Sequence, residues 1–149
     1  YLILGSIWNL FVETIIAIFV LAILRVLSGG YHSHTDLGCL LLSGIMIFLP
    51  IILSKYIFIS KLSFIVFFLG ILTVYYLYAP QDEKYIDASR EELLRVKIYV
   101  ILVLVGICLG SLFMDSQLGI IVMLVSLGQG VSLITKEIYD DKKSCYKKS

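Results

Sequence analysis

Charged residues are scarce in this chain. They make up 15% of its 149 residues, whereas hydrophobic residues make up 60% and the mean hydropathy is +0.99. A soluble domain averages roughly 45–50% apolar and about 25% charged residues. A water-soluble fold of this length could not bury so many apolar side chains, so we expect the excess to face lipid.

The sequence also lacks a charge imbalance and a disulfide framework. Its formal net charge is +1 and it has no basic patch interleaved with aromatic residues, which argues against nucleic acid binding. The cysteines Cys39, Cys108 and Cys145 are far apart and odd in number, so they predict no disulfide set. The first apolar run has neither a basic start nor a small-residue cleavage site, so we interpret it as a membrane span.

Five apolar runs approach the length of about 20 residues that a spanning helix needs. They are Leu2–Leu24, Leu37–Leu53, Leu62–Tyr78, Ile98–Met114 and Leu118–Thr135. We expect Asp115-Ser116-Gln117 to join the last two as a tight hairpin, and Ser89 to cap a helix that runs into the fourth. The prediction is an all-α fold: a polytopic transmembrane helical bundle of five spans, in one integral-membrane domain over residues 1–149.

The lysines and arginines predict an orientation for this bundle. With a cytoplasmic C-terminal tail, three segments share the cytoplasmic side: Arg25–Asp36, Ala79–Lys97 and the tail from Lys136. They hold ten of the twelve basic residues, and only Lys55 and Lys61 fall outside them. The positive-inside rule therefore predicts that the break between the first two spans faces the cytoplasm.

That break, over Arg25–Cys39, is the densest cluster of reactive side chains in the sequence. The pair Gly29-Gly30 can end the first helix, because glycine adopts positive φ at little cost. Either Thr35 or Asp36 can then cap the second helix. The sequence therefore predicts a helix break inside the cluster, with Cys39 in the first turn of the second span.

The helix break matters for the relation of His32 to Cys39. On one continuous helix their seven-residue separation would place them roughly 10 Å apart, too far for a hydrogen bond. A turn allows His32 to fold back toward Cys39. A helix N-terminus and a neighbouring imidazolium both favour the thiolate form of a cysteine, which is the arrangement of an activated nucleophile.

Other interpretations of the cluster stay open on spacing alone. The cysteine and histidine could be structural residues at a membrane boundary. His32, His34, Asp36 and Cys39 could bind zinc, although their spacing matches no familiar zinc motif.

Two polar residues inside apolar runs are further candidates. Glu13 lies within the first run, where a carboxylate is costly, so it either pairs with Asn9 or serves the site. Glu13 and Asp36 are candidates for the group that orients His32, although Asp36 could instead cap its helix. Gln129, in the last run, is interpreted as a contact between helices or between subunits.

The pattern Arg25-x4-Gly30-x-His32-x6-Cys39 between two spans resembles the accessory gene regulator B (AgrB) family. Tyr78-Ala79-Pro80, at the end of a later span, resembles a second signature of that family. The likeness covers most of the chain. Two features differ: residues 81–87 lack a proline and are rather acidic, and no N-terminal segment precedes the first span, which suggests truncation.

The resemblance implies a membrane-embedded cysteine endopeptidase of Gram-positive bacteria. Such enzymes cleave a short pro-peptide of the AgrD type and promote its cyclisation to a thiolactone or lactone autoinducer for quorum sensing. Cys39 would be the nucleophile and His32 the general base, with Arg25, Gly29 and Gly30 as supporting motif residues.

The same resemblance implies the setting of the enzyme. It would be a homodimer in the bacterial cell membrane, in contact with lipid. The basic residues, rather than the resemblance, place its active site on the cytoplasmic side, and we expect neither a cofactor nor a metal. The rival interpretations are a non-enzymatic transporter or signalling protein, and a metal-dependent membrane hydrolase that uses His32, His34 and Cys39.

Overall fold

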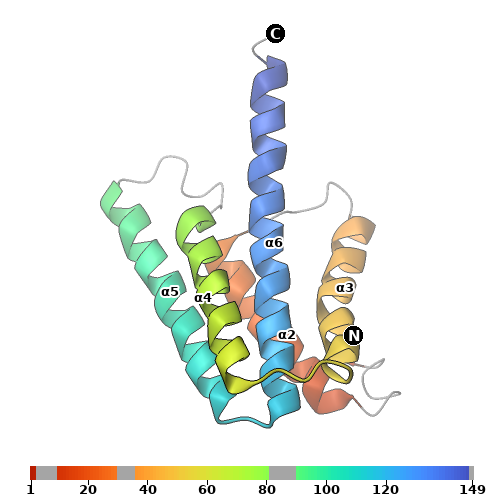
Figure 1. The fold of residues 1–149 in the computed structure, drawn as a ribbon. Helices are drawn as coiled ribbons and strands as arrows, with labels where there is room; N and C mark the ends of the chain where they lie inside the picture. The colour runs from red at the N-terminus through yellow and green to blue at the C-terminus, as the bar shows by residue number, and fades with distance from the viewer. Residues whose placement is uncertain (3–9, 30–35, 81–89, 148–149) are drawn as a thin grey trace.

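The computed structural model describes residues 1–2, 10–29, 36–80 and 90–147. Within these ranges the chain forms five helices and no strand (Figure 1). The helices are α2 (Phe11–Ser28), α3 (Asp36–Ser54), α4 (Lys61–Tyr78), α5 (Arg90–Leu112) and α6 (Ser116–Lys147). The predicted all-α fold is confirmed.

The first of these helices differs from its predicted position at both ends. It begins at Phe11, after Leu10, which has the non-helical dihedral angles φ −116° and ψ 33°. Residues 3–9 of the predicted run lie outside the described residues. The helix ends at Ser28 instead of Leu24. Hydropathy marks which residues are apolar, but the ends of a helix depend on backbone geometry, which hydropathy does not report.

The other helices contain most of their predicted apolar runs, and α6 extends well beyond its run. The apolar runs predicted at Leu37–Leu53 and Leu62–Tyr78 fall within α3 and α4, and α5 starts at Arg90, directly after the expected cap. Ser89 itself lies outside the described residues. Residues 113–115 separate α5 from α6, so the hairpin precedes its predicted place by two residues, and α6 continues twelve residues past Thr135.

Four of the helices are long and apolar enough to cross a membrane, namely α2, α3, α5 and residues 116–138 of α6. The apolar part of α4, Leu62–Tyr78, is slightly shorter. Large apolar side chains lie exposed on the outside of the bundle, among them Phe19, Leu41, Val66 and Leu102. A surface of this kind is suited to lipid, so the chain is a multi-pass membrane protein.

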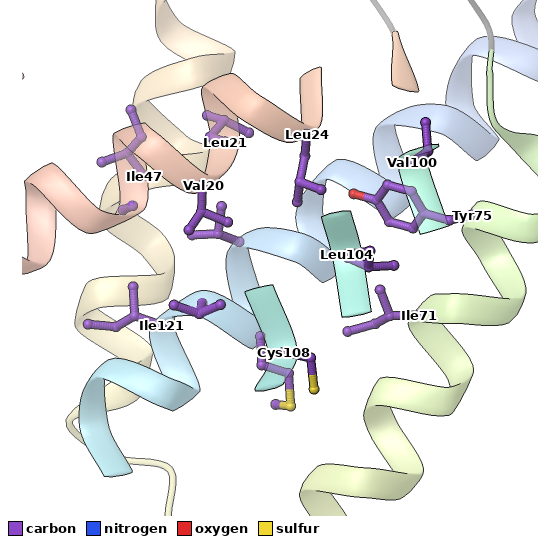
Figure 2. Close-up of a cluster of buried hydrophobic side chains, with 14 of the residues drawn as sticks. Val20, Leu21, Leu24, Ile47, Ile71, Tyr75, Val100, Leu104, Cys108 and Ile121 are labelled. Atoms are coloured by element: carbon purple, nitrogen blue, oxygen red, sulfur yellow. The ribbon is translucent and has the colours of Figure 1, made fainter. Parts of the chain in front are cut away.

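The axis of the bundle is α6. In its membrane-length segment 61% of the residues are buried, against 17–33% in the three other long helices. It contacts all four other helices, and Figure 1 shows it running through the middle of the bundle. Figure 2 shows the apolar cluster in which side chains of all five helices meet. Polar residues of α6 therefore lie where they can reach several helices at once.

The break between α2 and α3 lies at a defined end of the bundle. The C-terminal ends of α2 and α4, the N-terminal ends of α3 and α5 and the C-terminal part of α6 share that end (Figure 1). This arrangement agrees with the prediction that consecutive spans alternate in direction and so place the three basic segments on one side of the membrane. That this end faces the cytoplasm stays a prediction.

Candidate active site at the end of α2

Gly29 is where the chain leaves α2. It has φ 74° and ψ −145°, and its N–H donates to the Arg25 carbonyl oxygen at 3.0 Å. This region of φ and ψ is nearly restricted to glycine, since a side chain there strains the backbone. The helix ends at Ser28 and the next begins at Asp36, so the predicted break between Arg25 and Cys39 is confirmed.

Cys39 is the fourth residue of α3 and is half-buried. Its predicted place in the first turn of this helix is therefore confirmed. Asp36 is the first residue of α3, and Thr35, the other candidate for the cap, lies outside the described residues. The thiol thus lies beside the N-terminus of a helix, where the helix dipole carries partial positive charge.

Arg25, in the last turn of α2, bridges to α3. Its Nη1 donates to Ser43 Oγ at 3.0 Å, and its Nη2 lies 3.7 Å from Cys39 Sγ. Residues four apart on a helix share a face, so a single guanidinium reaches both Cys39 and Ser43. Two residues of the motif, fourteen positions apart in the sequence, meet at the helix break.

Ser43 was not among the residues singled out in the sequence. Its position could have indicated it: Ser43 is a polar residue in an otherwise apolar run, and it lies four residues after Cys39 on the same helix face. With its hydroxyl as acceptor, Ser43 holds the Arg25 guanidinium beside the sulfur.

The predicted partners of Cys39 in the break lie outside the described residues. These are Gly30, His32 and His34, so the pairing of His32 with Cys39 stays a prediction. Among the described residues no three histidine, cysteine, aspartate or glutamate side chains could hold a metal ion. Because both histidines are missing from that search, the metal-binding interpretation remains untested.

Glu13 does not join this site. It lies in the first turn of α2, not in mid-span, and twelve residues separate it from Arg25. At about 1.5 Å per residue the two positions are roughly 18 Å apart along the helix, so the structure does not bring Glu13 to Cys39. Asp36, three residues before Cys39, stays a prediction as an orienting group.

Gln129 of α6 reaches the end of α2. Its Nε2 donates to the Gly29 carbonyl oxygen at 2.6 Å and lies 3.4 Å from Ser28 Oγ. The interpretation of Gln129 as a contact between helices agrees with these bonds. The sequence did not indicate that this contact is made to Gly29, the residue that ends α2.

Gly29→Ala is expected to destabilise the protein, because the added Cβ is strained at positive φ. The cost should be about 1–3 kcal/mol in the free energy of unfolding, measured by thermal unfolding in detergent micelles. The matched control is Gly70→Ala, since Gly70 lies in α4 and an added Cβ meets no atom within 4 Å. Equal stability of the two variants would show that the turn at Gly29 tolerates a side chain.

The chain is similar to known proteins over most of its length. Residues 1–135 match the model of the family described as Accessory gene regulator B. Two curated relatives come from Clostridium perfringens. The protein named "Putative AgrB-like protein 2" (strain 13 / Type A) is 40% identical over 91 residues, covering 56% of this chain and 42% of the relative. The protein named "Putative AgrB-like protein" (strain SM101 / Type A) is 38% identical over 90 residues, covering 55% and 42%.

The matched region spans less than half the length of either relative. No solved structure matches the chain. The family match includes the helix break with Arg25 and Cys39, and it extends through α2 to α5 and more than half of α6. The chain belongs to the accessory gene regulator B family.

Proposed function

We propose that this protein is a membrane cysteine endopeptidase that cleaves a short pro-peptide of the AgrD type and promotes its cyclisation to a quorum-sensing autoinducer. The observation that carries the proposal is the contact between Arg25 and Cys39 at the break between α2 and α3. It places a half-buried thiol beside a cation and a helix N-terminus, at one end of an apolar bundle.

The reaction begins with Cys39 as nucleophile and His32 as general base. His32 takes the thiol proton, and the sulfur attacks a peptide carbonyl carbon near the C-terminal part of the pro-peptide. The C–N bond breaks, and the amine of the C-terminal part leaves with the proton from His32. The N-terminal part remains bound to Cys39 as a thioester.

Cyclisation follows from the reactivity of the thioester. A cysteine or serine side chain within the bound peptide attacks the thioester carbonyl, its proton passes to His32, and the Cys39 sulfur leaves and regains a proton. The product is a thiolactone or a lactone, and the enzyme returns to its starting state. Cyclisation competes with hydrolysis, so a site that excludes water favours the ring.

Arg25 has two roles in this scheme. Its positive charge beside Cys39 Sγ offsets the negative charge on the sulfur during attack and during its departure. Its bond to Ser43 restricts the guanidinium to the face of α3 that carries Cys39. A planar guanidinium can make both contacts at once, whereas an ammonium group is a single point of charge.

The surroundings of the pair suit an amphipathic substrate at a lipid boundary. Val26 and Leu40, next in sequence to Arg25 and Cys39, are 76% and 58% exposed. Apolar surface beside the thiol would bind the apolar side of a pro-peptide and keep water away. The proposal places the active site on the cytoplasmic side, because that end of the bundle carries most of the basic residues. It also includes a homodimer, which the family resemblance implies.

Arg25→Gln tests the contact that carries this proposal. A lost charge-assisted contact of about 1.5–3 kcal/mol should lower the cleavage rate about 10- to 100-fold, with a smaller loss for Arg25→Lys. The measurement is cleavage of a synthetic AgrD-type pro-peptide by purified protein in lipid vesicles. Arg95→Gln is the control, because Arg95 is an exposed cation near the N-terminus of α5, at the same end of the bundle. Equal rates for Arg25→Gln and Arg95→Gln would count against the proposed site.

A further inference from the structure

Gln129 is an unusual residue for the middle of an apolar bundle. Its side chain is completely buried in α6, the helix that contacts all the others. A buried amide in an apolar setting is costly unless its polar atoms are hydrogen-bonded. Its Nε2 is bonded, at 2.6 Å to the carbonyl oxygen of Gly29.

A series of contacts connects Gln129, through Gly29 and Arg25, to the thiol of Cys39. The Gly29 carbonyl accepts from Gln129, and the Gly29 N–H donates to the Arg25 carbonyl oxygen at 3.0 Å. The Arg25 side chain then reaches Cys39 Sγ and Ser43 Oγ on α3. Both peptide groups of the strained glycine are thus held, and the contacts link α6 to α2 and α2 to the nucleophile.

The other polar atom of Gln129 argues against a purely stabilising role. Gln129 Oε1 is buried and has no hydrogen-bond partner among the residues that the structure describes. An unpaired buried acceptor costs about 1–3 kcal/mol. Gln129 therefore makes its short bond to Gly29 and its longer one to Ser28 at a cost that an apolar side chain of the same size would not bring.

We propose that Gln129 is a positioning residue for the reaction of Cys39. By holding the Gly29 carbonyl, it fixes the end of α2 from which Arg25 approaches the sulfur. It touches neither the thiol nor the substrate in this role. The inference rests on the proposed peptidase function.

Gln129→Met separates this role from a structural one. Methionine has a similar volume and no donor for the Gly29 carbonyl. The substitution removes the unpaired acceptor Oε1 and leaves the Gly29 carbonyl with only the longer bond from Ser28 Oγ, at 3.4 Å. These two effects oppose each other, so the midpoint of thermal unfolding should change by less than about 4 °C. Misplacement of catalytic groups by about 1 Å can cost about 100-fold in rate, so we expect kcat to fall by up to that factor with KM unchanged.

The measurements are single-turnover acylation of Cys39 and steady-state cleavage of the synthetic pro-peptide in lipid vesicles. Ser126→Ala is the control, because Ser126 is buried one turn earlier on α6 and its Oγ donates to the Val122 carbonyl oxygen of its own helix. This variant should keep the wild-type kcat within about twofold, as expected for sites outside the network.

The possible outcomes separate the two proposals. Wild-type protein that forms no acyl-enzyme would overturn the peptidase function and the role of Gln129 together. Wild-type acylation with an equal rate constant in Gln129→Met would overturn only the role of Gln129. Gln129→Leu is the second apolar variant, and a loss of folded protein in both variants would show that Gln129 acts as a structural residue, which would also overturn the inference.

Discussion

Replacing Cys39 by alanine is expected to abolish cleavage of the pro-peptide, while the protein still inserts into the membrane. The thiol forms the acyl-enzyme, so no parallel route remains once the sulfur is absent. Loss of a covalent nucleophile lowers the rate by about 10⁴-fold or more. Cys39→Ser should be inactive as well, because a hydroxyl is a far weaker nucleophile near neutral pH than a cysteine.

Cys108→Ala is the matched control for the Cys39 variants. Cys108 is buried in the second half of α5, among the apolar side chains shown in Figure 2. It lies toward the end of α5 opposite to the helix break, and we expect wild-type cleavage when it is replaced. Precursor cleavage by Cys39→Ala at the wild-type rate would remove the basis of the proposed mechanism.

Replacing His32 by alanine is expected to lower the cleavage rate about 10²- to 10⁴-fold, the usual contribution of a general base. The effect should be on kcat, because His32 moves a proton and is not proposed to bind the pro-peptide. Cleavage of the synthetic pro-peptide by purified variants in lipid vesicles provides the measurement, with insertion checked by protease protection.

His34→Ala is the control that distinguishes the peptidase mechanism from the metal-dependent alternative. His34 lies two residues further along and belongs to the alternative metal site, so the peptidase mechanism predicts a much smaller loss for it. Comparable losses at His32, His34 and Asp36, together with inhibition by a chelator, would favour the metal-dependent hydrolase instead.

The helical architecture could be predicted from the sequence because the lipid environment leaves few choices. Apolar runs of about 20 residues form helices in a membrane, since their backbone groups have no other partners there. The ends of the helices were less predictable. The start of α2 at Phe11 depends on the backbone of Leu10, and the extension of α6 to Lys147 carries the helix into a charged segment that no hydropathy rule includes.

The candidate site, like the fold, could be predicted in part: the helix break could be placed from the sequence, but the contacts across it could not. Gly29 and Cys39 could be placed because a glycine pair ends helices and the next helix must begin shortly afterwards. The contact of Arg25 with Cys39 could not be predicted from the sequence, since it depends on how α2 and α3 pack. The structure places Glu13 in the first turn of α2, far from Cys39 along the helix, and its proposed role toward His32 stays a prediction.

Residues from distant parts of the chain were the hardest to assign. Gln129 lies one hundred positions from Gly29, and no sequence spacing relates the two. Their contact exists because α6 occupies the centre of the bundle, where a long polar side chain can reach the end of α2. Three-dimensional packing therefore supplied the residue that we propose positions the reactive end of α2.

One measurement tests the central claim most directly: purified protein in lipid vesicles is mixed with a synthetic AgrD-type pro-peptide, quenched in acid and examined by intact mass and peptide mapping. The proposed mechanism predicts an added mass equal to the N-terminal part of the peptide, attached to Cys39, released by hydroxylamine and absent from Cys39→Ala. Cleavage of the pro-peptide without any thioester on Cys39, or equal cleavage by Cys39→Ala, would contradict it.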